Sequence, residues 1–82
     1  MPLYMDVHRG VEGTAEDVAR AHEQDIETQE EHGVEYKTYW AGEDEGVVFC
    51  LFEAPNKEAG EKVHREAHGL VADEIFEVEE GE

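Results

Sequence analysis

The chain lacks serine altogether, and it contains one cysteine and only three lysines among its 82 residues. The absence of serine excludes a serine nucleophile, and the lone Cys50 cannot form an internal disulfide. Cys50 lies within an apolar run, which is typical of a small buried hydrophobic residue rather than a reactive thiol. No apolar stretch approaches membrane-spanning length, and the N-terminus has no basic start. We therefore predict a cytoplasmic protein without a membrane partner.

Basic residues are scarce as well, since 23 acidic side chains stand against six basic ones and the formal net charge is -17. Such a molecule repels phosphate backbones, so nucleic acid is excluded as a partner. The acidic residues decorate a regular apolar pattern, which favours a folded domain over disorder. An acidic surface with few lysines resembles proteins of salt-accumulating halophiles, in which high salt screens the repulsion.

Alternation and capping signals divide the chain into six elements. A first strand is predicted at Leu3–Val7, and further strands are expected at 35–40, 47–52 and 74–78. The first helix is predicted to begin at Thr14 and to end at Gly33, and Asn56 caps a second helix. The inward stripe of the first helix is predicted from Ala15, Val18, Ala19, His22 and Ile26. The order β-α-β-β-α-β predicts an α+β, ferredoxin-like sandwich: a four-stranded antiparallel sheet with both helices on one face. We expect one domain over residues 1–82, with 79–82 as a frayed tail.

The third strand, Val47–Phe52, consists of six consecutive apolar residues. Because alternate side chains point to opposite faces, half of them must lie on the open face of the sheet, beside Tyr4. Monomers rarely leave such a patch exposed, so we predict a homodimer that packs the two open faces together. A covering C-terminal tail and a small apolar ligand on that face are the alternatives.

Two histidines, His64 and His68, lie four residues apart at the end of the second helix and so share one face. The predicted topology brings this helix end to the same rim as His8, Asp73 and Glu74. Imidazole and carboxylate groups together suit a borderline transition metal rather than calcium or magnesium. The sequence therefore predicts a metal site made of His64 and His68, with His8, Asp73 or Glu74 completing the shell. The alternation of the first strand leaves open whether His8 faces the helices or the open side.

Other interpretations of these residues stay open. A histidine pair at this spacing also occurs on solvated helix faces. A rival function is the binding or transformation of a small organic molecule, which an apolar pocket containing Asp6, His8 or Tyr39 would favour, whereas a solid core with outward histidines favours metal binding. A purely structural interaction module is a third. We assign no catalytic residue and no organic cofactor; enzyme activity is left open, and a binding protein is favoured.

Three segments carry a resemblance to a known family: Pro2–Arg9, Val47–Pro55 and Val63–Gly69. They resemble a family of short, about 80-residue, ferredoxin-like nickel-binding proteins of actinobacteria, related in shape to dimeric α/β-barrel domains. The similarity spans nearly the whole chain. It implies a homodimer that takes up nickel(II), for sequestration or homeostasis, with other divalent transition metals as alternatives. The acidic composition departs from the usual family composition.

The charge imbalance predicts that stability depends steeply on salt. Raising ionic strength from 0.1 M to 1 M shortens the Debye length from about 10 Å to about 3 Å, which removes most of the repulsion between carboxylates. We expect the melting temperature to climb as potassium chloride is raised from about 0.1 to about 3 M, and mild acid to substitute in part. A melting temperature that stays flat would show that the acidic surface is not a salt adaptation.

Overall fold

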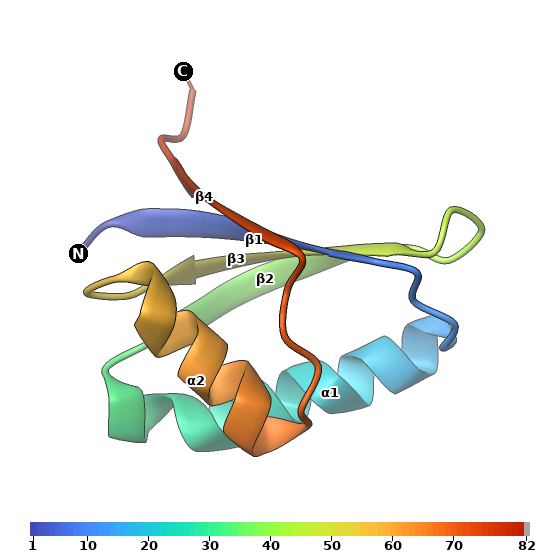
Figure 1. The fold of residues 1–82 in the computed structure, drawn as a ribbon, viewed down its shortest axis with the longest axis horizontal. Helices are drawn as coiled ribbons and strands as arrows, with labels where there is room; N and C mark the ends of the chain where they lie inside the picture. The colour runs from blue at the N-terminus through green and yellow to red at the C-terminus, as the bar shows by residue number, and fades with distance from the viewer. Residues whose placement is uncertain (82) are drawn as a thin grey trace.

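The predicted element order is confirmed by the computed structural model, which describes residues 1–81 (Figure 1). The elements are β1 (Leu3–Arg9), α1 (Ala15–Thr28), a 3-10 turn η1 (Gln29–His32), β2 (Glu35–Gly42), β3 (Val47–Glu53), α2 (Lys57–Ala67) and β4 (Glu74–Val78). Both helices cover one face of a four-stranded antiparallel sheet, which is the predicted ferredoxin-like fold. Of the predicted tail, residues 79–81 belong to no helix or strand, and Glu82 lies outside the described residues. Within residues 1–81, no helix is long and apolar enough to cross a membrane.

The helix boundaries follow the capping signals of the sequence. Thr14 and Asp17 form a reciprocal capping box at the start of α1, and the Asn56 side chain accepts a hydrogen bond from Ala59 N at the start of α2. Gly33 and Gly69 follow the helical segments with φ of 66° and 80°, in the left-handed region that glycine adopts without steric cost. The chain after Gly69 then crosses from α2 to the sheet as a segment we call the strap, residues 69–73.

Strand β1 lies at the centre of the sheet order β2-β3-β1-β4, between β3 and β4. Its even-numbered side chains Tyr4, Asp6 and His8 face the helices, which corrects our expectation that Tyr4 lies on the open face. Tyr4 stacks on Phe52 with the ring centroids 5.4 Å apart, inside the core. The polar Asp6 is tolerated on this face because α2 supplies it with a buried partner, His64. A central strand can thus present a carboxylate to the core and its apolar residues to the open side.

On α1 and on β2, some side chains face a different side from the one that simple periodicity predicts. On α1, Ala15 and Ile26 are exposed, whereas the acidic Asp25 is buried and faces the sheet, so the predicted apolar stripe is wrong at both ends. On β2, an irregularity between Tyr36 and Thr38 shifts the register by one residue. This bulge lets Tyr36 and Tyr39 both face the helices, while Trp40 turns to the open side and is 50% exposed.

All four strands contribute apolar side chains to the open face of the sheet, where Arg9, Thr38, Glu53 and Glu74 are among the polar members. Cross-strand register places on it Leu3, Met5, Val7, Trp40, Val47, Phe49, Leu51, Phe76 and Val78. Among these, Trp40 and Phe76 are each 50% exposed and Phe49 is 36% exposed. Large apolar side chains concentrated on one face mark an interaction surface.

We propose that a second copy of the chain covers this face. Light scattering at high salt should give the mass of a dimer at tens of micromolar protein, and Phe49→Glu, which places a charge in the patch, should give a monomer with the same far-UV spectrum. Glu27→Gln on the exposed face of α1 is the control. A monomeric wild-type mass would contradict the proposal.

Candidate metal centre

The centre of the helix–sheet interface is a buried histidine between two carboxylates. His64 is 1% exposed; its Nδ1 lies 2.8 Å from Asp25 Oδ1 on α1, and its Nε2 lies 2.8 Å from Asp6 Oδ2 on β1. Tyr36 on β2 donates its hydroxyl proton to the Gly60 carbonyl, and its oxygen lies 3.1 Å from the same Nε2. The imidazole of His64 therefore connects α2, α1, β1 and β2.

The two carboxylates decide the protonation of His64. Burial alone would lower its pKa, but the hydrogen bonds to Asp25 and Asp6 and the negative charges of both outweigh this effect and raise the pKa to about 9. Burial would in turn raise the pKa of Asp6 and Asp25, yet their hydrogen bonds with His64 lower both. At neutral pH the group is thus an imidazolium that donates one hydrogen bond to each carboxylate.

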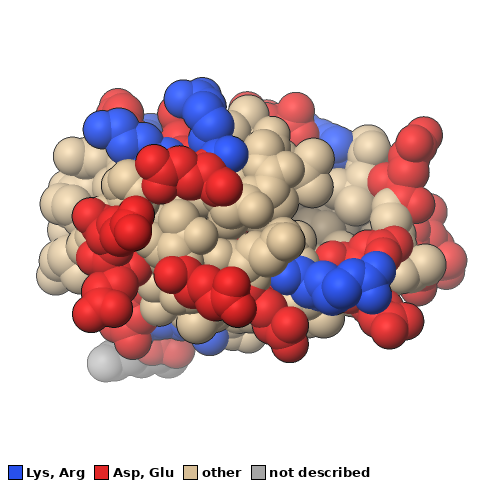
Figure 2. All heavy atoms as spheres, turned by 90° about the horizontal axis from the view of Figure 1, so that it is seen from below, with Lys and Arg blue, Asp and Glu red and all other residues tan. Residues whose placement is uncertain are grey.

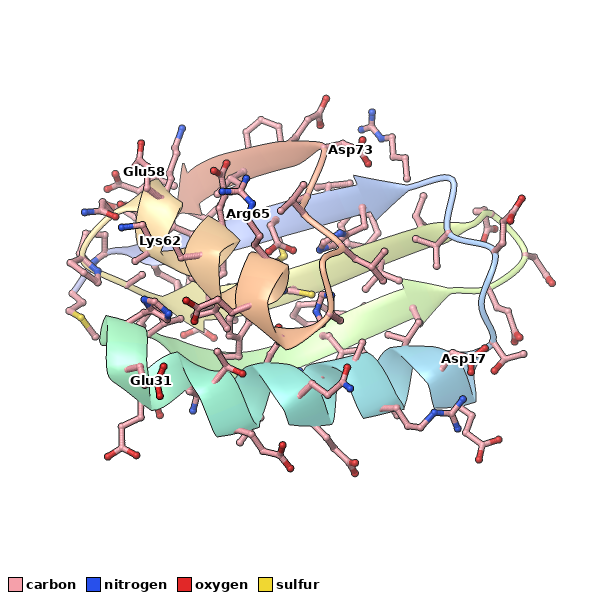
Figure 3. All side chains as sticks on the ribbon, turned by 60° about the horizontal axis from the view of Figure 1, so that its bottom comes forward. Asp17, Glu31, Glu58, Lys62, Arg65 and Asp73 are labelled. Carbon is pink, nitrogen blue, oxygen red and sulfur yellow. The ribbon has the colours of Figure 1, made fainter. Side chains whose placement is uncertain are left out.

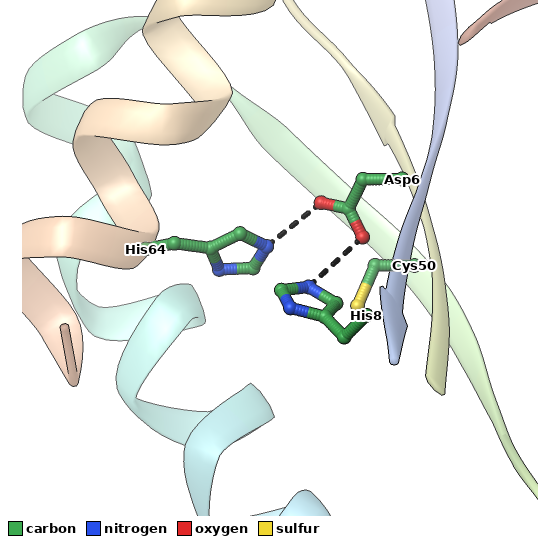
Figure 4. Close-up of side chains that lie close together, drawn as sticks. All are labelled: Asp6, His8, Cys50 and His64. Atoms are coloured by element: carbon green, nitrogen blue, oxygen red, sulfur yellow. Dashed lines mark hydrogen bonds and ion pairs between the residues drawn. The ribbon is translucent and has the colours of Figure 1, made fainter. Parts of the chain in front are cut away.

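Beside the Nε2 atom of His64, Asp6 is joined by His8 and Cys50 (Figure 4). One ligand atom from each of these four residues lies within 4.8 Å of the others. His8 Nε2 lies 3.2 Å from Asp6 Oδ1 in an ion-pair contact, and within residues 1–81 this buried oxygen accepts no hydrogen bond of good geometry. A buried carboxylate oxygen without a hydrogen bond calls for a cation or a proton. We call Asp6, His8, Cys50 and His64 the four-residue cluster.

The Cys50 thiol is kept protonated in this environment. Burial raises its pKa, and the negative charge of Asp6 raises it further. Without a cation, Cys50 therefore behaves as the small buried residue that the sequence predicts, and it is 6% exposed. A bound transition metal would reverse this state, because a coordinating thiol is deprotonated outright.

His68 shares a carboxylate with His64. Its Nε2 lies 3.0 Å from Asp25 Oδ1, and its Nδ1 accepts a hydrogen bond of 3.1 Å from Leu70 N in the strap. The imidazole therefore donates from Nε2 to Asp25 in this arrangement. Asp25, His64 and His68 form a second group whose ligand atoms lie within 4.8 Å of one another.

The structure brings His8, His64 and His68 together but places the two predicted carboxylates elsewhere. Ring centroids of His8 and His68 lie 4.9 and 5.1 Å from that of His64. Asp73 Oδ2 accepts a hydrogen bond from Arg9 N, and Glu74 forms an ion pair with the Arg9 side chain. These contacts tie the strap to β1. Asp6 and Asp25 occupy the carboxylate positions beside the histidines instead.

A pocket of about 590 Å³ opens beside both groups, between α1, the strap and the sheet. Its lining includes His8, Cys50, His64 and His68, together with Tyr39 and His22 on the wall opposite. Figure 2 shows this helix-covered side of the molecule, hollowed and surrounded by acidic side chains. The histidines thus line a pocket rather than an outer rim. From the sequence, a pocket of this kind was the feature expected to favour an organic ligand.

Comparison with known proteins places this architecture in a family. The fold and the histidine–carboxylate cluster define a small ferredoxin-like protein with a candidate metal centre. Residues 4–78 match the family described as nickel responsive protein SCO4226-like, so the chain belongs to that family. The crystal structure of SCO4226 from Streptomyces coelicolor A3(2) is 37% identical, with a TM-score of 0.90, covering 98% of this chain and 99% of that chain. No curated protein matches the chain.

The sequence did not identify Asp6, Asp25 and Cys50 as neighbours of the histidines. An acidic residue in a predicted central strand, such as Asp6, indicates a buried partner of opposite charge, because an unpaired carboxylate is rarely buried. Asp25 gave no such signal, since α1 carries acidic residues on every side.

The raised pKa of His64 predicts that metal-free stability falls with rising pH. A group whose pKa is higher in the folded state contributes fully below its unfolded value of 6.5, and the contribution is lost as pH rises through about 9. In 1 M potassium chloride, denaturant titrations should show a loss of about 2 kcal/mol between pH 6.5 and pH 8, before an unfolded cysteine ionises.

The variant His64→Gln should be less stable at pH 6.5 and nearly insensitive to pH over this range. His32→Gln, at the half-buried end of η1 and away from the His64 contacts, should keep the wild-type slope. A wild-type protein whose stability is constant over the range would show that His64 is not held as an imidazolium.

Proposed function

We propose that the chain binds nickel(II) through the four-residue cluster, in a role of sequestration or homeostasis. Membership of a nickel-responsive family supports the metal, and the convergence of Asp6, His8, Cys50 and His64 supports the position. Imidazole, thiolate and carboxylate together suit a borderline divalent ion, and zinc or cobalt would compete for the same ligands. The single observation that carries this assignment is the convergence on the buried Asp6 carboxylate of two imidazoles and a thiol, with one carboxylate oxygen held by the ion-pair contact with His8 alone (Figure 4).

The charge balance of the cluster fits a divalent cation. Among the three residues of the central contact, Asp6 and Asp25 contribute two negative charges and the His64 imidazolium one positive charge. One buried negative charge is therefore left uncompensated, which is costly in a low-dielectric interior. A divalent ion that replaces the Nε2 proton of His64 would balance both carboxylates, and a Cys50 thiolate would be stabilised by its direct bond to the ion.

The remaining contacts suit an outer shell around such an ion. If Nε2 of His64 holds the metal, Nδ1–H still donates to Asp25, which fixes the tautomer and orientation of the ring. His68 keeps its own hydrogen bond to Asp25 and its contact with the strap. In this arrangement His64 and His8 of the predicted ligands hold the ion, His68 acts through Asp25, and Asp73 and Glu74 anchor the strap.

The second group, Asp25, His64 and His68, is the rival position, and it would use the predicted pair His64 and His68 as ligands. The hydrogen bond that His68 already accepts disfavours metal binding at this second position. A metal on Nε2 of His68 would place the proton on Nδ1, where Leu70 N–H already donates, so two donors would face one another. The two positions predict different effects of single substitutions.

Nickel titrations of matched variants separate the positions. Cys50→Ala removes a ligand of the four-residue cluster without adding a polar group, so nickel affinity should fall by at least about 100-fold and the sulfur-to-nickel charge-transfer absorption should vanish. His68→Gln removes an outer contact and should weaken binding by about 10- to 100-fold while that absorption persists. His32→Gln controls for binding at the separate surface group of Glu31, His32 and Glu66. Calorimetry and near-UV absorption on the same samples provide both readouts.

Two outcomes would contradict the assignment. Wild-type affinity in Cys50→Ala together with no binding in His68→Gln would move the ion to the Asp25 group. Unchanged binding in both variants and in His8→Ala would refute a nickel site at the helix–sheet interface.

A further inference from the structure

The pocket beside the four-residue cluster is larger than a metal ion requires. We infer that it binds a small aryl-alkyl amine, with the aromatic body inside against Tyr39 and the ammonium group at the acidic mouth. This site goes beyond nickel binding and does not depend on it. The argument rests on the size of the cavity, the chemistry of its walls and the charges at its opening.

Size and wall chemistry favour an aromatic body. An engineered cavity of about 150 Å³ is enough for benzene, and this pocket of about 590 Å³ is roughly four times that volume. Apolar side chains line it from four separate segments: Val11 after β1, Val18 and Ala21 of α1, Val48 of β3, and Leu70 and Val71 of the strap. Tyr39 and His22 form an aromatic wall, with ring centroids 4.7 Å apart. These walls suit a flat apolar group.

The charged groups at the pocket select against an anion. Glu12, Asp17 and Asp73 line the pocket, and Asp17 and Asp73 are labelled in Figure 3. Asp17 is also paired with Arg20, and Asp73 accepts a hydrogen bond from Arg9 N. The cationic side chains of the lining are already paired: Arg9 with Glu74, and the His64 imidazolium with Asp6 and Asp25. The surrounding field is strongly negative as well, with a formal net charge of -17. A cation at the mouth is attracted, whereas a carboxylate there meets acids without a free basic partner.

Leu70 and Val71 in the strap add a second reason for an apolar ligand. They are 61% and 42% exposed although they belong to the pocket lining. A ligand in the pocket would cover part of this apolar surface, which contributes about 25 cal/mol for each Å² removed from water.

A series of ligands with one ring system and different charges tests the proposal. Tryptamine, indole-3-ethanol and indole-3-acetate share the indole ring and carry a positive, zero and negative charge. Equilibrium dialysis against the metal-free full-length protein should show saturable binding of one tryptamine per chain, weaker binding of the alcohol, and none of the acid. The same order should hold for nickel-loaded protein, so a failure of either proposal is visible separately.

Paired substitutions locate the site. Ala21→Trp fills the pocket from α1 and should abolish tryptamine binding, whereas Ala19→Trp, outside the lining on the same helix, should leave it unchanged. Glu12→Gln should weaken tryptamine binding by about threefold and leave the alcohol unaffected, because it removes one exposed charge. Glu27→Gln is the matched charge control. Tightest binding of the acid, no saturable binding of any indole, or equal effects of Ala21→Trp and Ala19→Trp would overturn the proposal.

Discussion

The structure depends on one buried contact, the imidazole of His64 held between Asp6 and Asp25. Two carboxylates in a protein interior are tolerated only if a cation lies between them, and the proton on His64 provides that charge. Asp6 comes from the central strand, Asp25 from the first helix and His64 from the second. The contact therefore sets the spacing of the helices on the sheet. It also creates a place where a metal ion can replace a proton.

Much of the fold follows from local signals in the sequence. The capping box at Thr14, the Asn56 cap and the glycines after both helices fix where the helices begin and end, and these signals act within a few residues. The face of the sheet on which each side chain lies was harder to predict. Tyr4 was expected on the open face because apolar residues usually face the helices. In the central strand the alternate set of side chains faces the helices instead, because α2 provides a polar partner there. A one-residue bulge in β2 likewise has no clear sequence signal, and it decides that Trp40 is exposed.

The sequence predicted which histidines lie together, but not which carboxylates lie beside them. Topology correctly brought His8 near His64 and His68, because the ends of β1 and α2 meet. The same topology placed Asp73 and Glu74 at this rim, but both side chains contact Arg9 rather than the histidines. The residues that fill those positions, Asp6 and Asp25, are distant from α2 in sequence and become neighbours only through packing. Whether the ion is held by the four-residue cluster rests on chemistry that spacing alone does not reveal.

The state of His64 is most directly measured by nitrogen NMR of protein labelled on its histidine rings. In the metal-free protein at pH 7, both ring nitrogens of His64 should carry protons, and they should titrate together near pH 9. Adding zinc as a diamagnetic substitute for nickel should remove the proton from Nε2 and leave Nδ1–H in place, donating to Asp25. A neutral His64 ring at pH 7 without metal, or a ring whose signals are unchanged at saturating zinc, would contradict this account.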